Sequence, residues 1–263
     1  MSAAWFTMAA ALGISLCAVS ARAQTPPPAD PAGGAAENDP TRPVLLSLRP
    51  EYYNGAGELA QSKLIFRYDQ ANFRQRRWLP GRRGAIFRFE VPLARTDLGG
   101  GGDTGIGDAY AQLLLIPYFT RRFAVVAGTG ALIPTATSEL LGTGKLVMAP
   151  LAGPLWFMQG RRGLVFVKFQ NFVSVAGDDS RADLNFLLVT PMVLRTFQQR
   201  WWVLVDTEAK TDWRRDGRTG FKSGVQVGHA ITEGIGVWAK PEVWWGVNRD
   251  GRWNLKFGIV WHR

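Results

Sequence analysis

The chain has 263 residues and a formal net charge of +10; 46% of its residues are hydrophobic and 20% are charged. Two histidines and one cysteine leave little material for metal or thiol chemistry, so we expect neither a metal site nor a cofactor. Beyond the N-terminal segment no run reaches about 18 apolar residues, which excludes a helical membrane protein but not a β-barrel.

The first 23 residues predict a cleaved signal peptide. An apolar run spans Ala9 to Val19, and Ala21-Arg22-Ala23 has the small-x-small pattern of a cleavage site. Leu16, just before Cys17, is too large for a lipoprotein cleavage site, so we expect no lipidation. Residues 24–43 are rich in Pro, Ala, Gly and Asp and predict a disordered arm. We expect the remaining residues, 44–263, to form the folded domain.

The basic residues are scattered and often fall in short turns, as at Arg121-Arg122 and Arg161-Arg162. A nucleic-acid-binding protein would cluster them on one face or helix. We therefore expect no nucleic-acid partner. An anionic lipid or lipopolysaccharide surface is the partner that the charge favours in an exported protein.

From residue 44 onward, turn-like clusters separate about twelve segments of strand length. We expect strands near 44–53, 62–69, 83–94, 107–119, 122–133, 144–157, 163–175, 182–197, 200–210, 219–230, 235–247 and 252–262. Several alternate with period 2: in the last segment, odd-numbered positions from Trp253 to Trp261 are apolar, whereas Asn254 and Lys256 lie between them, with Val260 as an exception. A soluble periplasmic β-protein would show the same alternation and stays an alternative.

Three features favour a transmembrane barrel. Apolar strands continue almost to the C-terminus, where barrel-assembly machinery commonly engages a terminal strand. Short connections alternate with longer ones, as outer-membrane barrels require. Tryptophans gather near segment ends, as an interfacial girdle would place them; they are Trp78, Trp156, Trp201, Trp213, Trp244, Trp253 and Trp261. The predicted fold is an all-β, antiparallel transmembrane β-barrel of about twelve strands in the outer membrane, with both termini periplasmic.

Prolines inside the expected strands conflict with a closed barrel, because proline lacks the N–H that a ladder needs. The interior positions are Pro117, Pro150, Pro154, Pro191 and Pro241. We expect bulges or strand ends there.

Four stretches resemble a family of bacterial outer-membrane barrels: 96–115 (TDLGGGGDTGIGDAYAQLLL), 133–150 (IPTATSELLGTGKLVMAP), 176–191 (AGDDSRADLNFLLVTP) and 201–213 (WWVLVDTEAKTDW). This family is related to the one named for the meta-cleavage pathway of phenol degradation, and members are labelled "transporter" or, misleadingly, "neuromedin U". The resemblance spans roughly residues 44 to 263. It implies a barrel, an outer-membrane location and a role in the uptake of hydrophobic compounds, and brings no established active site. The chain departs from the family in its Pro-rich arm and in ending Trp261-His262-Arg263.

Charged residues opposite the apolar faces predict the lining of the barrel lumen, because charges facing hydrocarbon would be costly. The lumen-lining candidates are Arg67, Arg88, Glu90, Lys168, Arg195, Asp206, Glu208, Lys210, Lys222, Lys240, Glu242 and Lys256. They form either a salt-bridge network that fills a narrow barrel or a polar path that selects solutes by charge. A barrel of twelve strands lies between filled barrels and open porins, so its size leaves both interpretations open.

Enzyme chemistry finds little support, and we expect no enzyme. Gly142-Thr143-Gly144-Lys145 lacks the Ser or Thr that follows the lysine of a phosphate loop. Asp97, Asp103 and Asp108 are too far apart for a calcium loop. His229 and Ser223 share a strand face but lie about 20 Å apart. The sequence predicts a pore or transport component for small solutes, hydrophobic ones among them; a lipid-modifying outer-membrane enzyme and a closed structural barrel are the alternatives.

Overall fold

The computed structural model describes residues 46–55, 60–72, 84–97, 102–198 and 200–261, all of them within the predicted barrel domain. The expected signal peptide (1–23) and arm (24–43) lie outside the described residues. The strands are β1 (Leu46–Gly55), β2 (Ala60–Asn72), β3 (Ala85–Thr96), β4 (Asp103–Ile106), β5 (Ala109–Phe119), β6 (Phe123–Ile133), β7 (Lys145–Phe157), β8 (Gly163–Gly177), β9 (Asn185–Phe197), β10 (Trp201–Asp212), β11 (Arg218–Ala230), β12 (Ile235–Trp245) and β13 (Gly251–Trp261).

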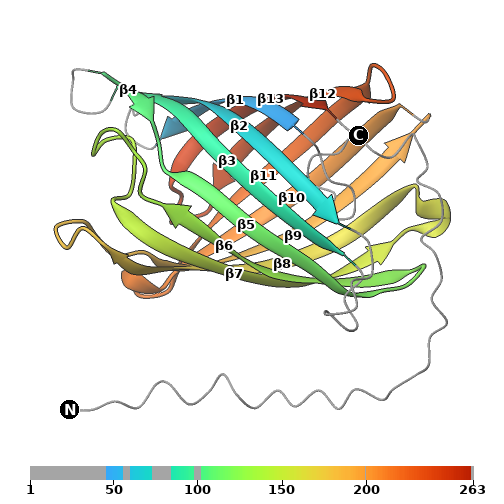
Figure 1. Cartoon of the computed structure of the whole chain (residues 1–263), viewed down its shortest axis with the longest axis horizontal. Coiled ribbons are helices and arrows are strands. Elements are labelled where there is room, and N and C mark those ends of the chain that lie inside the picture. The colour runs from blue at the N-terminus through green and yellow to red at the C-terminus, as the bar shows by residue number, and fades with distance from the viewer. Residues whose placement is uncertain (1–45, 56–59, 73–83, 98–101, 199, 262–263) are drawn as a thin grey trace, which may run out of the picture.

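These strands form one closed antiparallel wall (Figure 1). Neighbours in sequence pair with each other, and β1 pairs with β13 to close the barrel. We call each full crossing of the barrel wall a stave. The short β4 is not a further stave. It pairs with β3 beyond the stretch that pairs with β5, so β4 and β5 together make one stave that is broken at Gly107 and Asp108. The barrel therefore has twelve staves, which confirms the predicted fold class.

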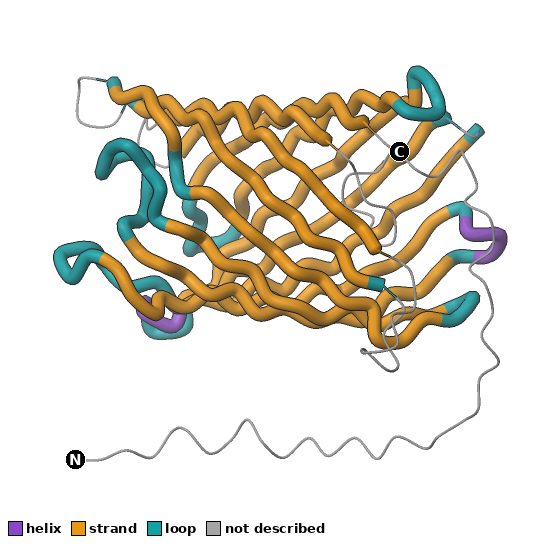
Figure 2. Tube along the Cα trace, viewed as in Figure 1, coloured by secondary structure: helices purple, strands orange, loops and turns teal. Residues whose placement is uncertain are grey.

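The connections divide the barrel into two ends, which Figure 2 shows in teal at opposite ends of the orange strands. One end, the short-turn end, carries the tight connections at 120–122, 158–162, 198–200 and 231–234 and the last strand residue, Trp261. The other, the long-loop end, carries longer connections such as 134–144 and 178–184. The connection 73–83 lies outside the described residues. Because the stave number is even, β1 begins and β13 ends at the short-turn end.

Successive side chains point alternately to the two sides of the wall, as the period-2 pattern predicts. Phe87, Val205 and Phe257 are 44%, 46% and 48% exposed on the outer face. Asp206, next to Val205 in the chain, is 6% exposed because it points inward. Apolar side chains dominate the exposed outer face, which is the arrangement that a bilayer requires of a barrel.

Aromatic side chains are exposed on the outer face near both ends of the staves, as interfacial girdles are. Near the short-turn end these are Trp156, Trp201 and Trp261, and near the long-loop end they are Trp245 and Trp253. Trp213 is exposed in the connection between β10 and β11. The prediction that Trp244 belongs to a girdle is wrong, because it has the parity of the inward Lys240 and Glu242 and packs edge-on against Tyr53. Trp78 lies outside the described residues.

The prolines are accommodated in two ways. Pro117 sits where the register between β5 and β6 shifts by one residue, so the predicted bulge is confirmed there. At Pro150 and Pro191 no bulge forms: the ladder continues unbroken on one side of the strand and lacks a pair on the other. Pro154 and Pro241 behave in the same way. A single missing N–H thus interrupts the ladder with one neighbouring strand and leaves the register unchanged.

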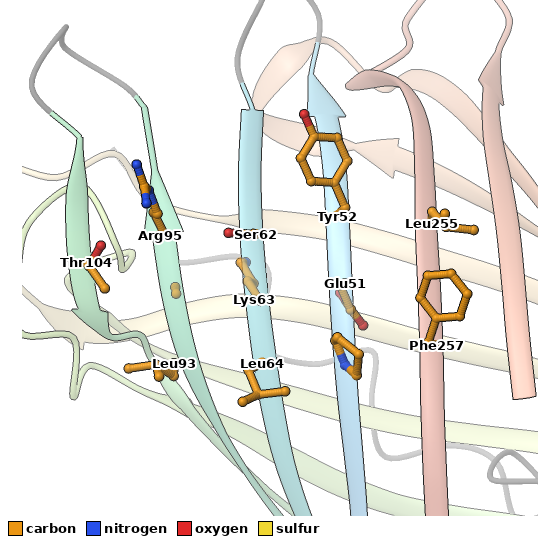
Figure 3. Close-up of a pocket in the computed structure, with 12 residues that line it drawn as sticks. Glu51, Tyr52, Ser62, Lys63, Leu64, Leu93, Arg95, Thr104, Leu255 and Phe257 are labelled. Carbon is orange, nitrogen blue, oxygen red and sulfur yellow. The ribbon is translucent and has the colours of Figure 1, made fainter. Parts of the chain in front are cut away.

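A shallow groove of about 420 Å³ runs along the wall over β1, β2, β3 and β13 (Figure 3). Its sides are formed by outward side chains that include Tyr52, Leu64, Leu93 and Phe257. The groove lies over the outward side chains of these strands. In the described part of the chain, no helix is long and apolar enough to cross a bilayer.

Candidate functional site: the barrel lumen

Eleven of the twelve lumen candidates have the parity of the inner face, namely Arg67, Arg88, Glu90, Lys168, Asp206, Glu208, Lys210, Lys222, Lys240, Glu242 and Lys256. Arg195 does not. It is exposed on the outer face next to the buried, inward Leu194, and its guanidinium lies 5.4 Å from the ring centre of Phe197. Arg195 sits two residues from the short-turn end of β9, where a long side chain can reach the membrane surface. Its predicted place in the lumen is therefore corrected.

A continuous ion-pair network covers the wall from β10 to β13. Lys240 bonds to Asp206 across β11 and lies 2.9 Å from Glu242. Glu242 also lies 3.1 Å from Lys256 and accepts a hydrogen bond from Asn254. Gly224 of β11 makes room for this crossing, because a Cβ there would meet the side chains of Lys240 and Glu242. Charges on three staves, β10, β12 and β13, thus neutralise one another on the inner wall.

A second charge cluster lies on β1, β2 and β3. The carboxylate of Asp69 is fully buried and bonds to the guanidinium groups of both Arg67 and Arg88. Arg49 of β1 bonds in turn to Glu90 at 3.2 Å. These two clusters correspond to a salt-bridge network, which is one of the two interpretations of these residues given above.

Towards the short-turn end the inner face changes from charged to apolar. The apolar constriction, as we call it, comprises Ile86, Leu114, Ile116, Ala124, Val126, Leu151, Leu155, Leu164, Phe166, Met192, Leu194, Trp202, Leu204, Trp238 and Val260. Every member is at most 7% exposed, although all of them point inward from the wall. Side chains from nine staves therefore pack together in this half of the barrel and narrow the lumen.

Two indoles of the constriction lie over glycines of neighbouring strands. A Cβ at Gly228 would collide with the indole of Trp202, and a Cβ at Gly258 would collide with that of Trp238. In the ladder Gly228 is the partner of both tryptophans, so they flank it from β10 and β12. Glycine is required at these positions because the indoles occupy the space of a side chain.

A cavity of about 310 Å³, the lumen cavity, lies on the long-loop side of the constriction. It is lined by Arg88, Tyr110, Gln112, Leu114, Val126, Leu151, Phe166, Lys168, Gln170, Phe172, Leu188 and Met192. The apolar lining residues nearest the short-turn end belong to the constriction itself. The cavity therefore has a polar upper part, towards the long-loop end, and an apolar floor, towards the short-turn end.

The long loops are tied together above this cavity. The carboxylate of Asp108 accepts hydrogen bonds from the hydroxyl of Thr143 at 2.8 Å and from the backbone N–H groups of Thr143 and Ala136. Arg181 donates to the carbonyl oxygens of Glu139 and Gly142 at 2.7 and 2.8 Å. These bonds attach connection 134–144 both to the break between β4 and β5 and to connection 178–184.

An ion pair adds to this loop contact. A hydrogen bond from Lys145 lowers the pKa of the exposed Asp183, whose carboxylate lies 3.0 Å from the lysine Nζ. Since the folded-state pKa is depressed, the contact is present at neutral pH and is lost as the pH falls through that lowered pKa. Asp108, whose spacing in the sequence does not suit a calcium loop, instead holds the long loops together.

Replacing Asp108 by Ala should loosen connection 134–144, because the Thr143 and Ala136 groups lose their acceptor. We expect faster cleavage after Glu139 by a glutamate-specific protease added to folded protein. Asp179→Ala, in the exposed connection 178–184, is the control and should leave the cleavage rate unchanged. Equal rates for wild type and Asp108→Ala would show that this carboxylate does not hold the loop.

His229 and Ser223 do not meet. His229 lies on the outer face of β11 with its ring 4.3 Å from that of Trp201. The hydroxyl of Ser223 instead contacts Thr207 and the indole of Trp245, each at 2.9 Å. No group of three or more potential metal ligands occurs in the part of the chain that the structure describes. The polar and apolar lumen is thus the candidate site.

The comparisons with known proteins agree with this architecture. No family model and no curated protein sequence matches the chain. Among solved structures, an outer membrane channel from Pseudomonas putida F1 superposes with a TM-score of 0.65 at 12% identity, covering 83% of this chain and 96% of that one. The KdgM porin (TM-score 0.55, 10% identity) and the NanC porin (0.53, 11%) each cover 83% of this chain, at 98% and 99% of their own lengths. At these identities the likeness establishes the fold alone, the closed β-barrel that these outer-membrane proteins share with this chain.

Proposed function

We propose that the protein is a narrow outer-membrane channel for small solutes. The observation that carries the proposal is a solute-sized cavity enclosed by the wall, between the looped end and the apolar constriction. The constriction consists of side chains of the wall strands, and no separate segment plugs it within the described residues. Rotation of a few side chains would therefore open a path, whereas a folded plug would have to leave as a unit.

The apolar constriction also favours one kind of solute. Water and ions pass apolar constrictions poorly, because nothing there replaces their hydration. A solute with apolar surface loses less on entering it. The proposed channel therefore conducts hydrophobic or amphipathic small molecules better than hydrated ions, in line with the uptake role that the family resemblance implies.

In this proposal the short-turn end faces the periplasm, and the exposed apolar wall contacts lipid and lipopolysaccharide after insertion by the barrel-assembly machinery. Short periplasmic turns and long outside loops are the rule for such barrels. We expect the mature protein in the outer-membrane fraction, migrating faster on a gel before heating than after. Recovery in the soluble fraction without detergent would contradict this placement.

Solute entry into proteoliposomes tests the channel. Vesicles containing the protein should swell in isotonic solutions of small neutral solutes faster than empty vesicles, and faster for monosaccharide-sized than for trisaccharide-sized solutes. A filled structural barrel would give no swelling with any solute. The unfolded protein, added at the same concentration, controls for leaks.

A further inference from the structure

The upper part of the lumen cavity presents hydrogen-bond donors. Lys168 of β8 lines the cavity and forms no ion pair or hydrogen bond with any described residue. Its ladder partner on β9 is Thr190, a neutral residue. The carboxylates one stave further on are already engaged, because Glu208 pairs with Lys222 at 3.0 Å and Asp206 pairs with Lys240. The ammonium group therefore lines the cavity with no carboxylate within ion-pair distance among the described residues, and Glu208 and Asp206 attract it only from further away.

Tyr110 adds a second donor. Its hydroxyl oxygen accepts hydrogen bonds from the side-chain amides of Gln112 and Gln170, at 2.8 and 2.9 Å. A phenol has a single O–H, and both amides use its oxygen as an acceptor, so the proton is left to be donated elsewhere. Tyr110 lines the same cavity as Lys168.

Other polar groups at the cavity follow the same pattern. Arg88 lines the cavity while bonding to Asp69, so it adds positive charge that is only partly neutralised. The hydroxyl of Thr190 is buried, points inward between the cavity residues Leu188 and Met192, and has no hydrogen-bond partner in the described structure. Lys168, the Tyr110 hydroxyl and Arg88 thus bring positive charge and unused donors to the cavity lining, which is the chemistry that receives an anion.

The rest of the cavity is apolar. Its floor is the constriction, with Phe166 and Met192 among the lining residues, and Phe172 stands above them. The volume of about 310 Å³ lies at the small end of the range for ligand pockets. A half-buried lysine that has no ion pair is stabilised when an anion or water meets it. A ligand that joins an anionic group to a compact apolar body would satisfy both surfaces at once.

We propose that the lumen cavity is a binding subsite for small organic anions of this kind, such as aromatic carboxylates, and that Lys168 determines the specificity. This inference rests on the proposed channel function and names its solute class. The carboxylate would lie at the Lys168 ammonium and the Tyr110 hydroxyl. The apolar body would point at the constriction, so that the solute enters the narrow part with its apolar end first.

Calorimetric titration of the detergent-solubilised protein tests the subsite without requiring transport. The probes are benzoate, benzyl alcohol (same ring, no charge) and acetate (same charge, no ring). We expect benzoate to bind at least tenfold more tightly than either of the others. Lys168→Met should abolish that preference, Lys168→Arg should retain it, and Tyr110→Phe should weaken benzoate binding severalfold.

Arg195→Met is the matched control, because it removes one positive charge from the outer face and should leave benzoate affinity unchanged. Equal affinity for benzoate and benzyl alcohol, or unchanged benzoate binding in folded Lys168→Met, would overturn the subsite. Swelling of proteoliposomes without such binding refutes the subsite and leaves the channel standing. Binding without flux of any solute refutes the channel and leaves the subsite standing.

Discussion

Trp202→Ala combined with Trp238→Ala should raise the conductance of the channel severalfold in planar bilayers. The two indoles fill the inner face over Gly228 and Gly258, where the wall itself has no side chains. Removing both leaves a path bounded by backbone and methyl groups on β10 to β13. Their buried Nε1 groups have no hydrogen-bond partners in the described structure, so removing the indoles breaks no polar network.

The control for this variant is Trp201→Ala, which removes the same side chain from the outer face of β10, where it is 45% exposed. Its conductance should equal that of the wild type. Since truncating a buried tryptophan costs about 3–5 kcal/mol of stability, each variant must first show the heat-dependent gel shift of a folded barrel. A folded double variant with wild-type conductance would mean that the indoles do not limit passage.

Glu242→Gln should lower the free energy of unfolding by about 3–5 kcal/mol, the usual cost of breaking a buried ion pair from one side. The Glu242 side chain is 1% exposed and bonds to Lys240, Lys256 and Asn254. Glutamine keeps the shape but removes the charge, which leaves two lysines sharing fewer carboxylates. Urea unfolding in lipid vesicles, followed by tryptophan fluorescence, measures the change.

Asp97→Asn supplies the comparison. Asp97 lies 3.8 Å from Arg95 with both side chains well exposed, and such pairs contribute at most about 1 kcal/mol. If Glu242→Gln proved as mild as Asp97→Asn, the lumen network would be hydrated and mobile instead of a fixed part of the wall.

Most of the fold follows from the sequence because the bilayer and the closed barrel impose one rule on every strand. Apolar residues such as Phe87 and Val205 have to face lipid, and the residues between them have to face inward. The period of two therefore gives strand positions and faces together. The break at Gly107 and Asp108 was not predicted, since a one-residue shift between β4 and β5 leaves no mark in the alternation.

The lumen was predicted only in part, because the rule that charges point inward holds only where the outer face meets hydrocarbon. At the short-turn end it fails: Arg195 points out to the membrane surface, while Leu194 and Trp202 fill the lumen. The sequence does contain a signal of the apolar constriction, namely the residues that depart from the period-2 alternation. Val260 and Phe166, which break the pattern as apolar residues on the inner face, both belong to the constriction.

The cavity polar groups Tyr110, Gln112 and Gln170 were also missed, because neutral residues do not stand out in a charge pattern. That Lys168 lacks a partner was equally hidden. Pairing depends on which staves are neighbours and on the register between them, and alternation within one strand specifies neither. Only the assembled wall shows that the nearby carboxylates are already engaged with other lysines.

The central claim is that neighbouring residues from β1 onward face lipid and an enclosed lumen by turns. The accessibility of spin labels to oxygen and to a nickel complex, in the reconstituted protein, tests it most directly. Labels at Val205, Val225 and Phe257 should be relaxed by oxygen, which partitions into lipid, and shielded from a water-soluble nickel complex. Labels at Glu208 and Lys222 should be shielded from the lipid-phase oxygen. Nickel contact at Val205 or Phe257, together with strong oxygen contact at Glu208, would contradict the barrel described here.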